Sequence, residues 1–566
     1  MSFPWARHYD PGVPLEIVPP DATVPQLLLQ TAQRIPQAPA VNFLGRTLSY
    51  GEFQRQTALV AQALAHQGLT KGERLAMLLP NCPQLMLSYY AALHLGAVVV
   101  LLNPLLSPNE IAFQLTDSGA RRLIVLDHLL PKIEALEKKI SLSHLIVTSL
   151  ADYLPWPLSW LYSLKARWQK LPVGFRPASN RWRWQDLLTG PPWCDPVQAA
   201  SDDLALLQYT GGTTGTPKAA MLTHRNLLAN VAQINAWLPR IRYGQERVVA
   251  LLPFFHVFGL TACLNWPFSQ GAMDIVLPRF EIKSFCKALK RYRPTVLPGV
   301  PTLFVALNNY PPLAQIDLSS LWACISGSAP LPVEVRDRFE QLTGCRILEG
   351  YGLTESSPVT HLNPLQGERP PGSIGLPFPS TQARIVDQES GTRDLPVGEV
   401  GELIVKGPQV MRGYWQKPEE TALALRNGWL YTGDLARMDD KGFFYIIDRK
   451  KDMIIDGGFK IYPREIEEVL YRHPQVKEAV ALGVPDAYRG EVVKVVIVPQ
   501  EGAQLSAADI QAHLEPLLAA YKLPKIIEFR QELPKSAVGK ILRRLLREET
   551  LAASQKPQPN GTDMTV

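Results

Sequence analysis

Residues 204–218 read LALLQYTGGTTGTPK, an apolar run that continues into a loop of small and hydroxyl-bearing residues. The ten residues from Tyr209 to Lys218 include three glycines, four threonines and one lysine. Such a loop cannot form a core, but its backbone N–H groups, hydroxyls and ammonium can surround an anion. The run 204–207 is typical of a buried strand, and a helix is expected from His224. The sequence therefore predicts a strand, a glycine loop and a helix that together hold phosphate.

This loop differs from the P-loop of nucleotide hydrolases. In the P-loop, a glycine, a lysine and a serine or threonine are adjacent at the start of a helix. Here two residues separate Gly215 from Lys218, and one of them, Pro217, has no amide N–H to donate. The alternative interpretation is a surface loop without a ligand, because stretches rich in Gly and Thr often have no other role.

Size and composition limit the class of protein. The chain has 566 residues, which exceeds one ordinary core, so at least two domains are expected. Hydrophobic residues make up 46%, as in soluble globular proteins. The net charge of +6 is too small to indicate a nucleic-acid partner, and none is expected. Six scattered cysteines without paired spacing favour a reduced, cytoplasmic setting and no zinc site.

One segment, Leu85 to Leu106, is apolar enough to be mistaken for a membrane span. It contains His94 and Asn103 and changes to β-branched residues after a Gly-Ala pair. We therefore expect a helix followed by a buried strand, because a bilayer span needs about 20 uninterrupted apolar residues. Residues 1–10 show no signal-peptide pattern, in keeping with the cytoplasmic expectation.

Strand-like and helix-like stretches alternate from residue 46 onward and resume after residue 200, which predicts parallel-rich sheets covered by helices. The pattern changes near residue 450, after the charged run 448–452, which is expected to be a linker. We predict an α/β protein with a large N-terminal domain and a small mobile α+β C-terminal domain. The expected limits are 1–450 with a β-subdomain at about 367–447, then 451–550, then a disordered tail at 551–566.

Further segments carry groups that suit a nucleotide. Residues 349–355, EGYGLTE, combine a tight turn with a hydroxyl and Glu355, a hard oxygen ligand of the kind that Mg²⁺ prefers. Asp434 ends the run WLYTGD and could hold two ribose hydroxyls, and Arg449 could reach the same ribose or a phosphate. Each segment alone is equally compatible with an ordinary structural turn.

Two segments near the C-terminus complete the set. Lys540 ends the flexible stretch PKSAVGK, and a lysine is a compact charge suited to neutralising a transition state. Gly457 and Gly458 lack side chains, as the wall of a narrow tunnel would.

Together and in this order, the segments resemble the acyl-adenylate-forming superfamily. Its members include acyl-CoA synthetases, firefly-type luciferases and the adenylation domains of peptide synthetases. The resemblance spans about residues 40–547 and is closest to bacterial long-chain fatty-acid–CoA ligases. The strongest stretches are 208–226, 349–358, 398–434 and 448–470. One departure is Ala219, which stands where many members carry glycine.

The resemblance implies a role for each matching residue. The residues that would hold the β- and γ-phosphates of ATP are Thr210, Gly211, Gly212, Thr213, Thr214, Gly215, Thr216 and Lys218. Those that would enclose the adenine are Gly327, Ser328, Ala329, Glu349, Gly350, Tyr351 and Gly352. The ribose would be held by Asp434 and Arg449.

The resemblance also implies catalytic and mobile parts. Thr354 would contact phosphate, Glu355 would bind Mg²⁺, and Lys540 would act in adenylation only. Lys451 matches the hinge about which the small domain turns between half-reactions, after which Gly457 and Gly458 would line the pantetheine path of coenzyme A (CoA).

The implied reaction joins a long-chain fatty acid to AMP with release of pyrophosphate, and CoA then displaces AMP. No enzyme nucleophile is required. The alternatives are an acyl-AMP ligase that loads a carrier protein, a CoA ligase for medium-chain or aryl acids, and a luciferase-like monooxygenase. From another class, the chain could be a non-catalytic acyl-binding protein associated with membranes. A homodimer remains open as the oligomeric state.

The sequence indicates the residues of the substrate pocket less specifically than those of the nucleotide site. His256 lies in an aromatic run, where a histidine is commonly a satisfied core residue, but the matching family segment lies between the acyl pocket and the CoA tunnel. We expect His256 to act as a gate between the acyl pocket and the CoA tunnel. Leu260, Thr302 and Leu303 are expected to line the acyl pocket.

Residues 153–185 contain five tryptophans, six lysines and arginines, and no acidic residue. Aromatic and basic side chains together suit an anionic membrane interface, from which a long-chain acid would be delivered. We therefore predict peripheral association with the inner face of the membrane through this segment. The alternative is a surface arm whose arginines stack on its own tryptophans.

Overall fold

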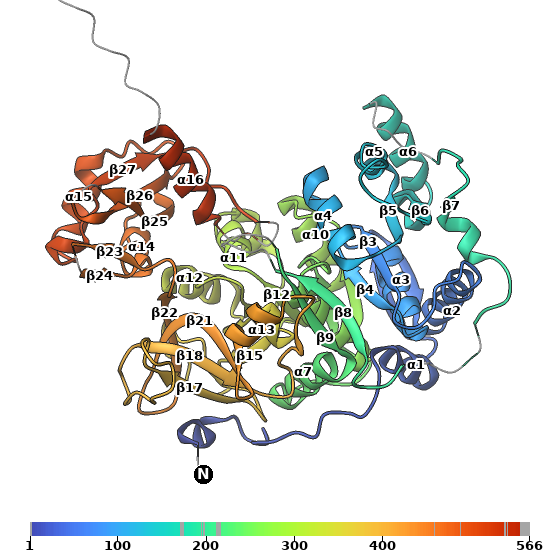
Figure 1. Cartoon of the computed structure of the whole chain (residues 1–566), viewed down its shortest axis with the longest axis horizontal. Helices are drawn as coiled ribbons and strands as arrows, with labels where there is room; N and C mark the ends of the chain where they lie inside the picture. Colours follow the sequence, from blue (N-terminus) through green and yellow to red (C-terminus); the bar gives the residue numbers. More distant parts are fainter. Residues whose placement is uncertain are drawn as a thin grey trace, which may run out of the picture. The chain divides into compact units, whose positions relative to one another are not determined.

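The computed structural model describes residues 3–169, 175–193, 195, 199–210, 217–457, 459–486, 488–536, 539 and 541–554 (Figure 1). The chain divides into two compact units. The first unit comprises Met1–Arg384, Ile404–Thr432 and Asp440–Phe444. The second comprises Ile385–Leu403, Gly433–Asp439 and Tyr445–Val566. The α/β class with a large N-terminal part and a smaller C-terminal part is confirmed; the predicted domain limits stay predictions.

Two large sheets organise the first unit. The nine-stranded sheet has the order β16-β15-β14-β13-β12-β10-β11-β1-β2. Its strands are β16 (Leu376–Pro377), β15 (Val359–Leu362), β14 (Ile347–Gly352), β13 (Ala323–Ser326), β12 (Val296–Gly299), β10 (Arg247–Ala250), β11 (Met273–Val276), β1 (Pro39–Phe43) and β2 (Arg46–Ser49). The run from β14 to β1 is parallel, as the alternating sequence pattern predicts.

The second sheet is eight-stranded, with the order β19-β9-β8-β4-β3-β5-β6-β7. Its strands are β19 (Gly413–Tyr414), β9 (Ala219–Thr223), β8 (Leu204–Tyr209), β4 (Val98–Leu101), β3 (Arg74–Leu78), β5 (Arg122–Leu126), β6 (His144–Thr148) and β7 (Arg181–Arg183). Every residue of β4 is buried, which explains its unbroken Val-Val-Val-Leu sequence in the interior of a sheet covered on both faces.

One strand that follows the glycine loop was not predicted from the sequence. The loop does not lead directly into a helix, because residues 219–223 form β9, which pairs antiparallel with β8. The N–H of Thr210 donates to the carbonyl of Lys218 at 2.8 Å and closes the hairpin. Helix α7 (His224–Trp237) begins where expected, but only after β9. Strand β9 therefore separates Lys218 from the start of α7, and the phosphate-holding role of the loop stays a prediction.

The helices follow the apolar periodicity of the sequence. Those of the first unit are α1 (Val24–Arg34), α2 (Tyr50–His66), α3 (Pro83–His94), α4 (Pro108–Ser118), α5 (Leu130–Glu134), α6 (Leu158–Trp168), α7, α8 (Val257–Leu260), α9 (Trp266–Ser269), α10 (Ile282–Tyr292), α11 (Pro301–Asn308), α12 (Val333–Thr343) and α13 (Pro418–Ala424). A π-helical turn, Thr261–Asn265, joins α8 to α9. The segment that could be mistaken for a membrane span is α3 followed by β4, as predicted, and α3 is apolar on all sides because it is buried on all sides. No helix in the described ranges is long and apolar enough to cross a membrane.

A five-stranded sheet carries the short alternating runs of the predicted β-subdomain. Its strands are β17 (Gln382–Val386), β18 (Gly401–Lys406), β21 (Trp429–Met438), β20 (Leu425–Arg426) and β22 (Phe444–Arg449). Its first four strands follow one another in that order, and β22 pairs with β21. The charged run 448–452 is not simply a solvated linker, because β22 extends to Arg449 and Asp448 is buried.

The C-terminal part has its own sheet and core. The strands β24 (Phe459–Ile461), β23 (Ile454–Asp456), β26 (Gly490–Pro499), β25 (Val476–Asp486) and β27 (Ile526–Phe529) accompany the helices α14 (Pro463–Tyr471), α15 (Ala507–Leu514) and α16 (Arg543–Ser554). Apolar residues of α14, α15, β25 and β26 pack into one core. Helix α16 runs to Ser554, into the segment that the sequence predicts to be disordered.

One buried carboxyl group stands out in the core of the first unit. Asp274, on β11, has no exposed surface, and neither of its oxygens has a hydrogen-bond partner among the described residues. Burial raises the pKa of Asp274 well above its ordinary value of 3.8. At a pH above 3.8 and below the raised pKa, Asp274 has lost its proton in the unfolded chain but keeps it in the folded chain. The free energy of unfolding should therefore fall as the pH rises from about 4 toward the raised pKa.

We predict that Asp274→Asn removes this pH dependence, because asparagine has no proton to release. The measurement is the thermal unfolding midpoint of variant and wild type, from calorimetric scans at each pH. The midpoint of the variant minus that of the wild type should be small near about pH 4 and should become more positive toward about pH 8. Asp440→Asn, at an exposed aspartate, is the matched control and should show no such trend. A difference independent of pH would contradict a protonated Asp274.

Candidate active site

Three predicted or neighbouring side chains meet at the end of the glycine loop. The ammonium Nζ of Lys218 lies 5.4 Å from the ring centroid of Tyr414, a cation–π distance. The Tyr414 hydroxyl donates to Glu355 Oε1 at 2.7 Å. Burial and the neighbouring Glu355 carboxylate both raise the pKa of Tyr414, so its hydroxyl stays protonated and remains a donor. The loop lysine and the predicted Mg²⁺ ligand are thus linked through a tyrosine.

Strand pairing brings these three residues together. Strand β19, which carries Tyr414, pairs antiparallel with β9, directly after Lys218. Glu355 lies in a short 3₁₀ turn, Thr354–Ser356, whose position is fixed because the N–H of Met411 donates to the Glu355 carbonyl at 2.8 Å. Thr354 is half-buried at the start of the same turn. The predicted phosphate and metal contacts are therefore adjacent in the first unit.

The single carboxylate of Glu355 suits Mg²⁺ better than a metal ion whose ligands all come from protein side chains. No cluster of three His, Cys, Asp or Glu side chains suited to a metal occurs in the described part of the chain. Glu355 is a single half-buried carboxylate, oriented by one hydrogen bond. Mg²⁺ commonly uses one or two carboxylates and takes its other ligands from phosphates and water. One oriented carboxylate near Lys218 of the predicted phosphate loop is consistent with such a metal.

The predicted adenine residues lie on neighbouring strands. Ser326, the last residue of β13, is in register with Glu349 of β14, so the segment 327–329 leaves the sheet beside Glu349. The buried Glu349 carboxylate accepts the N–H of Leu331 at 3.1 Å and ties the two segments together. Ser328 has a left-handed backbone, with φ of 70°.

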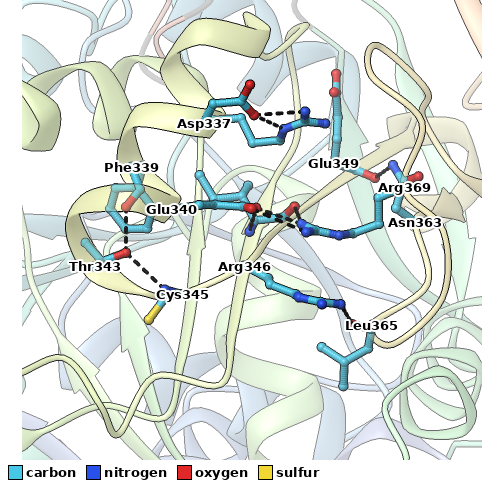
Figure 2. A network of polar contacts seen from close by, with 12 residues as sticks. Asp337, Phe339, Glu340, Thr343, Cys345, Arg346, Glu349, Asn363, Leu365 and Arg369 are labelled. Atoms are coloured by element: carbon cyan, nitrogen blue, oxygen red, sulfur yellow. Dashed lines mark hydrogen bonds and ion pairs between the residues drawn. The ribbon is translucent and has the colours of Figure 1, made fainter.

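A polar network behind β14 holds Glu349 in place (Figure 2). Asn363 donates its side-chain N–H to the Glu349 carbonyl at 2.9 Å. Arg369 donates to Glu340 at 2.7 Å, and Glu340 in turn accepts the N–H of Ile347, the first residue of β14, at 2.8 Å. Figure 2 shows these residues converging on one strand from α12 and from the chain after β15. These contacts hold the first half of β14, from Ile347 to Glu349, in place.

Close packing within the protein explains why glycine occupies positions 350 and 352. A Cβ on Gly350 would collide with Leu362, and one on Gly352 with the backbone of Pro358, because β15 lies against this part of β14. Tyr351, between them, lies in edge-to-face contact with the buried His361 ring, at a centroid distance of 6.0 Å. The glycines are thus required for strand packing, whether or not a base also approaches them.

The predicted substrate-pocket residues fall on two helices. His256 is the N-cap of α8, and its Nδ1 accepts the N–H of Phe258 at 3.2 Å. Leu260 is buried at the end of α8. Thr302 is half-buried and Leu303 is buried on α11, where Leu303 belongs to a packed core cluster. A Cβ on Gly327 would lie 3.1 Å from the Phe258 ring, so α8 abuts the predicted adenine segment.

In the second unit, the two predicted ribose residues are brought together. Arg449 Nε lies 3.6 Å from Asp434 Oδ1. The adjacent Asp448 is buried and accepts the N–H groups of Arg449 at 2.7 Å and Arg464 at 3.0 Å. Burial raises the pKa of Asp448 to about 6. The predicted hinge residue, Lys451, is exposed.

A charge cluster connects the hinge segment with the chain that follows Lys540. Arg543, the first residue of α16, lies 2.6 Å from Glu467 and 3.5 Å from Asp452, next to Lys451. Gly457 has φ of 56° at the end of β23, a conformation that favours glycine. Gly458, Lys540 and the loop residues 211–216 lie outside the described residues. Sequence reasoning missed Tyr414 and Arg543, whose positions depend on strand β19 and on helix α16.

The sequence comparisons extend over nearly the whole chain. Residues 28–415 match the family described as AMP-binding enzyme, and residues 465–540 match the AMP-binding enzyme C-terminal domain. A protein of Bacillus subtilis named long-chain-fatty-acid–CoA ligase is 47% identical over 97% of this chain and 98% of its own length.

Solved structures are similar over the same extent. ATP-bound MatB from Rhodopseudomonas palustris has a TM-score of 0.81 and 30% identity, over 93% of this chain and 99% of that one. The anthranilate CoA ligase AuaEII in complex with anthranoyl-AMP has a TM-score of 0.83 and 28% identity, over 95% and 99%. The fold and site define an enzyme that handles adenine nucleotides. The chain belongs to the AMP-binding enzyme family.

Proposed function

We propose that this chain is an ATP-dependent ligase that joins a long-chain fatty acid to CoA. The observation that carries the proposal is the near full-length similarity to the B. subtilis long-chain-fatty-acid–CoA ligase. The retained Lys218, Glu355 and Asp434 argue against a non-catalytic scaffold. The similarity to a protein named as a CoA ligase favours CoA as the acyl acceptor over a carrier protein. It also favours thioester formation over a luciferase-like reaction with oxygen.

The reaction has two steps. A carboxylate oxygen of the fatty acid attacks the α-phosphorus of ATP, the bond to the β-phosphate oxygen breaks, and pyrophosphate leaves with acyl-AMP remaining. The CoA sulfur, its proton lost to solvent, then attacks the acyl carbon, and AMP leaves with the electron pair of the broken C–O bond. The acid becomes a good electrophile only after it is joined to AMP, so no covalent enzyme intermediate is needed.

The proposed roles follow the residue positions. Loop amides from Thr210 to Lys218, with the Lys218 ammonium, hold the phosphates. Glu349 fixes the turn against which the adenine lies. Negative charge builds on the phosphoryl oxygens during adenylation. Cations held in fixed positions stabilise this charge, and we expect them to supply most of the lowering of the activation barrier. Lys540 is proposed as the cation that acts in this step alone.

Further roles are proposed for the remaining residues. Asp434 and Arg449 hold the ribose, Thr354 contacts phosphate, and His256 separates acyl chain from CoA. Mg²⁺, held by Glu355, would supply charge neutralisation at the phosphates when bound. Lys451 is the hinge, and Gly457 with Gly458 lines the pantetheine path. Since a long-chain acid partitions into lipid, we also propose that the chain contacts membranes peripherally through residues 153–185.

The direct test measures AMP release and thioester formation with palmitate, octanoate and benzoate, each with ATP, Mg²⁺ and CoA. We expect both products with all components present, the highest kcat/KM for palmitate, and no AMP when CoA and acid are both omitted. Turnover of benzoate without turnover of palmitate would refute the long-chain assignment. AMP release without any thioester would refute CoA as the acceptor.

We predict that Lys540→Ala separates the half-reactions. Palmitate-dependent pyrophosphate release should fall by at least about 100-fold, because a charge that stabilises the adenylation transition state is removed. Thioester formation from supplied palmitoyl-AMP and CoA should stay within about threefold, since that step does not use the charge. Lys535→Ala is the matched control, because Lys535 lies in the same segment but pairs with Glu478 at 2.6 Å. An equal loss in both half-reactions would contradict the role.

We predict that Tyr414→Phe acts through Glu355. Without the donated hydrogen bond the carboxylate is no longer oriented, and the Mg²⁺ concentration for half-maximal adenylation should rise roughly tenfold. In a Glu355→Ala background the same substitution should add almost nothing, because the partner is already gone. Tyr445→Phe, which removes a hydroxyl bonded to Asp439, serves as control. Additive losses would show that Tyr414 acts independently of Glu355.

A further inference from the structure

Helix α6 presents large apolar side chains to solvent. Trp160, Leu161, Leu164 and Trp168 are all exposed, with Trp160 at 61% and Trp168 at 82% of full accessibility. Just before the helix, Trp156 is 85% exposed. Figure 1 shows α6 beside α5 at the outer edge of the first unit. A cluster of this size is uncommon on soluble monomers, where exposed apolar residues are usually scattered singly.

The exposed residues lie on one face of the helix. Positions 160, 164 and 168 repeat every four residues, and 161 is adjacent to this row, so the four side chains form one stripe, here called the α6 stripe. The opposite face packs inward, with Ala166 buried and Tyr162 half-buried. Burial raises the pKa of the Tyr162 hydroxyl. The helix therefore has an inner face held by the protein and an outer face without a partner among the described residues.

Several side chains of residues 175–184, by contrast, contact other groups of the protein. Arg181 pairs with Glu134 and Glu137, each at 2.8 Å, and Arg176 pairs with Glu134 at 3.2 Å. The guanidinium of Arg183 lies 4.8 Å from the Phe175 ring centroid. Trp184 is fully buried, and Trp182 stacks on His144 with centroids 4.6 Å apart. The part 175–184 thus packs within the protein, whereas the α6 stripe is exposed.

We propose that the α6 stripe inserts into the interface of a lipid bilayer and is the membrane-docking element of this chain. The inference deepens the proposed function, because it names the surface on which a lipid-derived acid would be collected. Tryptophan prefers the headgroup level and leucine the acyl boundary, so the composition of the stripe matches both layers. Lys165 is exposed on the same helix, and 153–185 contains no acidic residue to repel anionic lipid.

This assignment predicts a particular mode of binding. Insertion of apolar side chains is not screened by salt, whereas attraction between exposed charges is. Because Arg176 and Arg181 are paired with glutamates of the protein, docking should depend on the stripe more than on these basic residues. The alternative occupant is a second copy of the chain, which would bury the same stripe in a dimer interface.

The test is co-sedimentation of the purified full-length chain with vesicles of phosphatidylcholine and phosphatidylglycerol in equal amounts, at low and at high salt. Wild type should partition onto vesicles, and raising the salt should weaken partition by no more than about threefold. The double variant Trp160→Ser/Trp168→Ser should weaken it by at least about tenfold. Trp160→Lys, a single change at an exposed position, should reduce it in the same direction.

Controls separate the possible outcomes. Leu342→Ser and Tyr488→Ser, at exposed residues of α12 and of the loop between β25 and β26, should leave partition unchanged, as should Arg176→Gln. Turnover of octanoate without vesicles should be the same in the stripe variants as in wild type, which establishes folding and tests the ligase function separately. Unchanged partition of the stripe variants would overturn the proposal. So would conversion of a dimer to a monomer, seen by sedimentation velocity, without loss of vesicle binding.

Discussion

The two-sided pairing of strand β9 is the constraint on which the candidate active site depends. On one side β9 pairs with β8 and closes the glycine loop, and on the other it pairs with β19. Ala220 is opposite Tyr414 in this ladder. A shift of one residue would turn the Tyr414 side chain to the other face of the sheet, away from Lys218 and Glu355. Backbone hydrogen bonds thus determine the geometry of groups that are far apart in sequence.

Strand β14 imposes a second constraint, because it lies between a parallel and an antiparallel neighbour. β13 aligns Glu349 with the segment after Ser326, while the chain entering β15 comes close enough that a Cβ on Gly352 would collide with the backbone of Pro358. Glu349 itself is held by two hydrogen bonds, one from the Asn363 side chain to its carbonyl and one from the Leu331 N–H to its carboxylate. A rigid turn of this kind suits a site in which catalysis depends on positioning rather than on an enzyme nucleophile.

Much of the fold could be predicted from local patterns, and the failures have physical reasons. The helix and buried strand expected within Leu85–Leu106 are found as α3 and β4, because periodicity and length identify such elements. Strand β9 was missed because its four apolar residues are followed directly by Thr223, the N-cap of α7, and are too few to show a period. Asp448 was expected in a solvated linker, yet it is buried, because backbone N–H groups of Arg449 and Arg464 converge on it.

The sequence by itself determined the types of group available: a glycine and threonine loop ending in lysine, a lone hard carboxylate at Glu355, and tryptophans without acidic neighbours in 153–185. Those properties are local and survive any arrangement of the chain. Only the tertiary structure decided which groups meet. It joined Lys218 to Glu355 through Tyr414 and divided the tryptophans into buried and exposed sets, because both outcomes depend on strand register and helix rotation, which are set by contacts between distant segments.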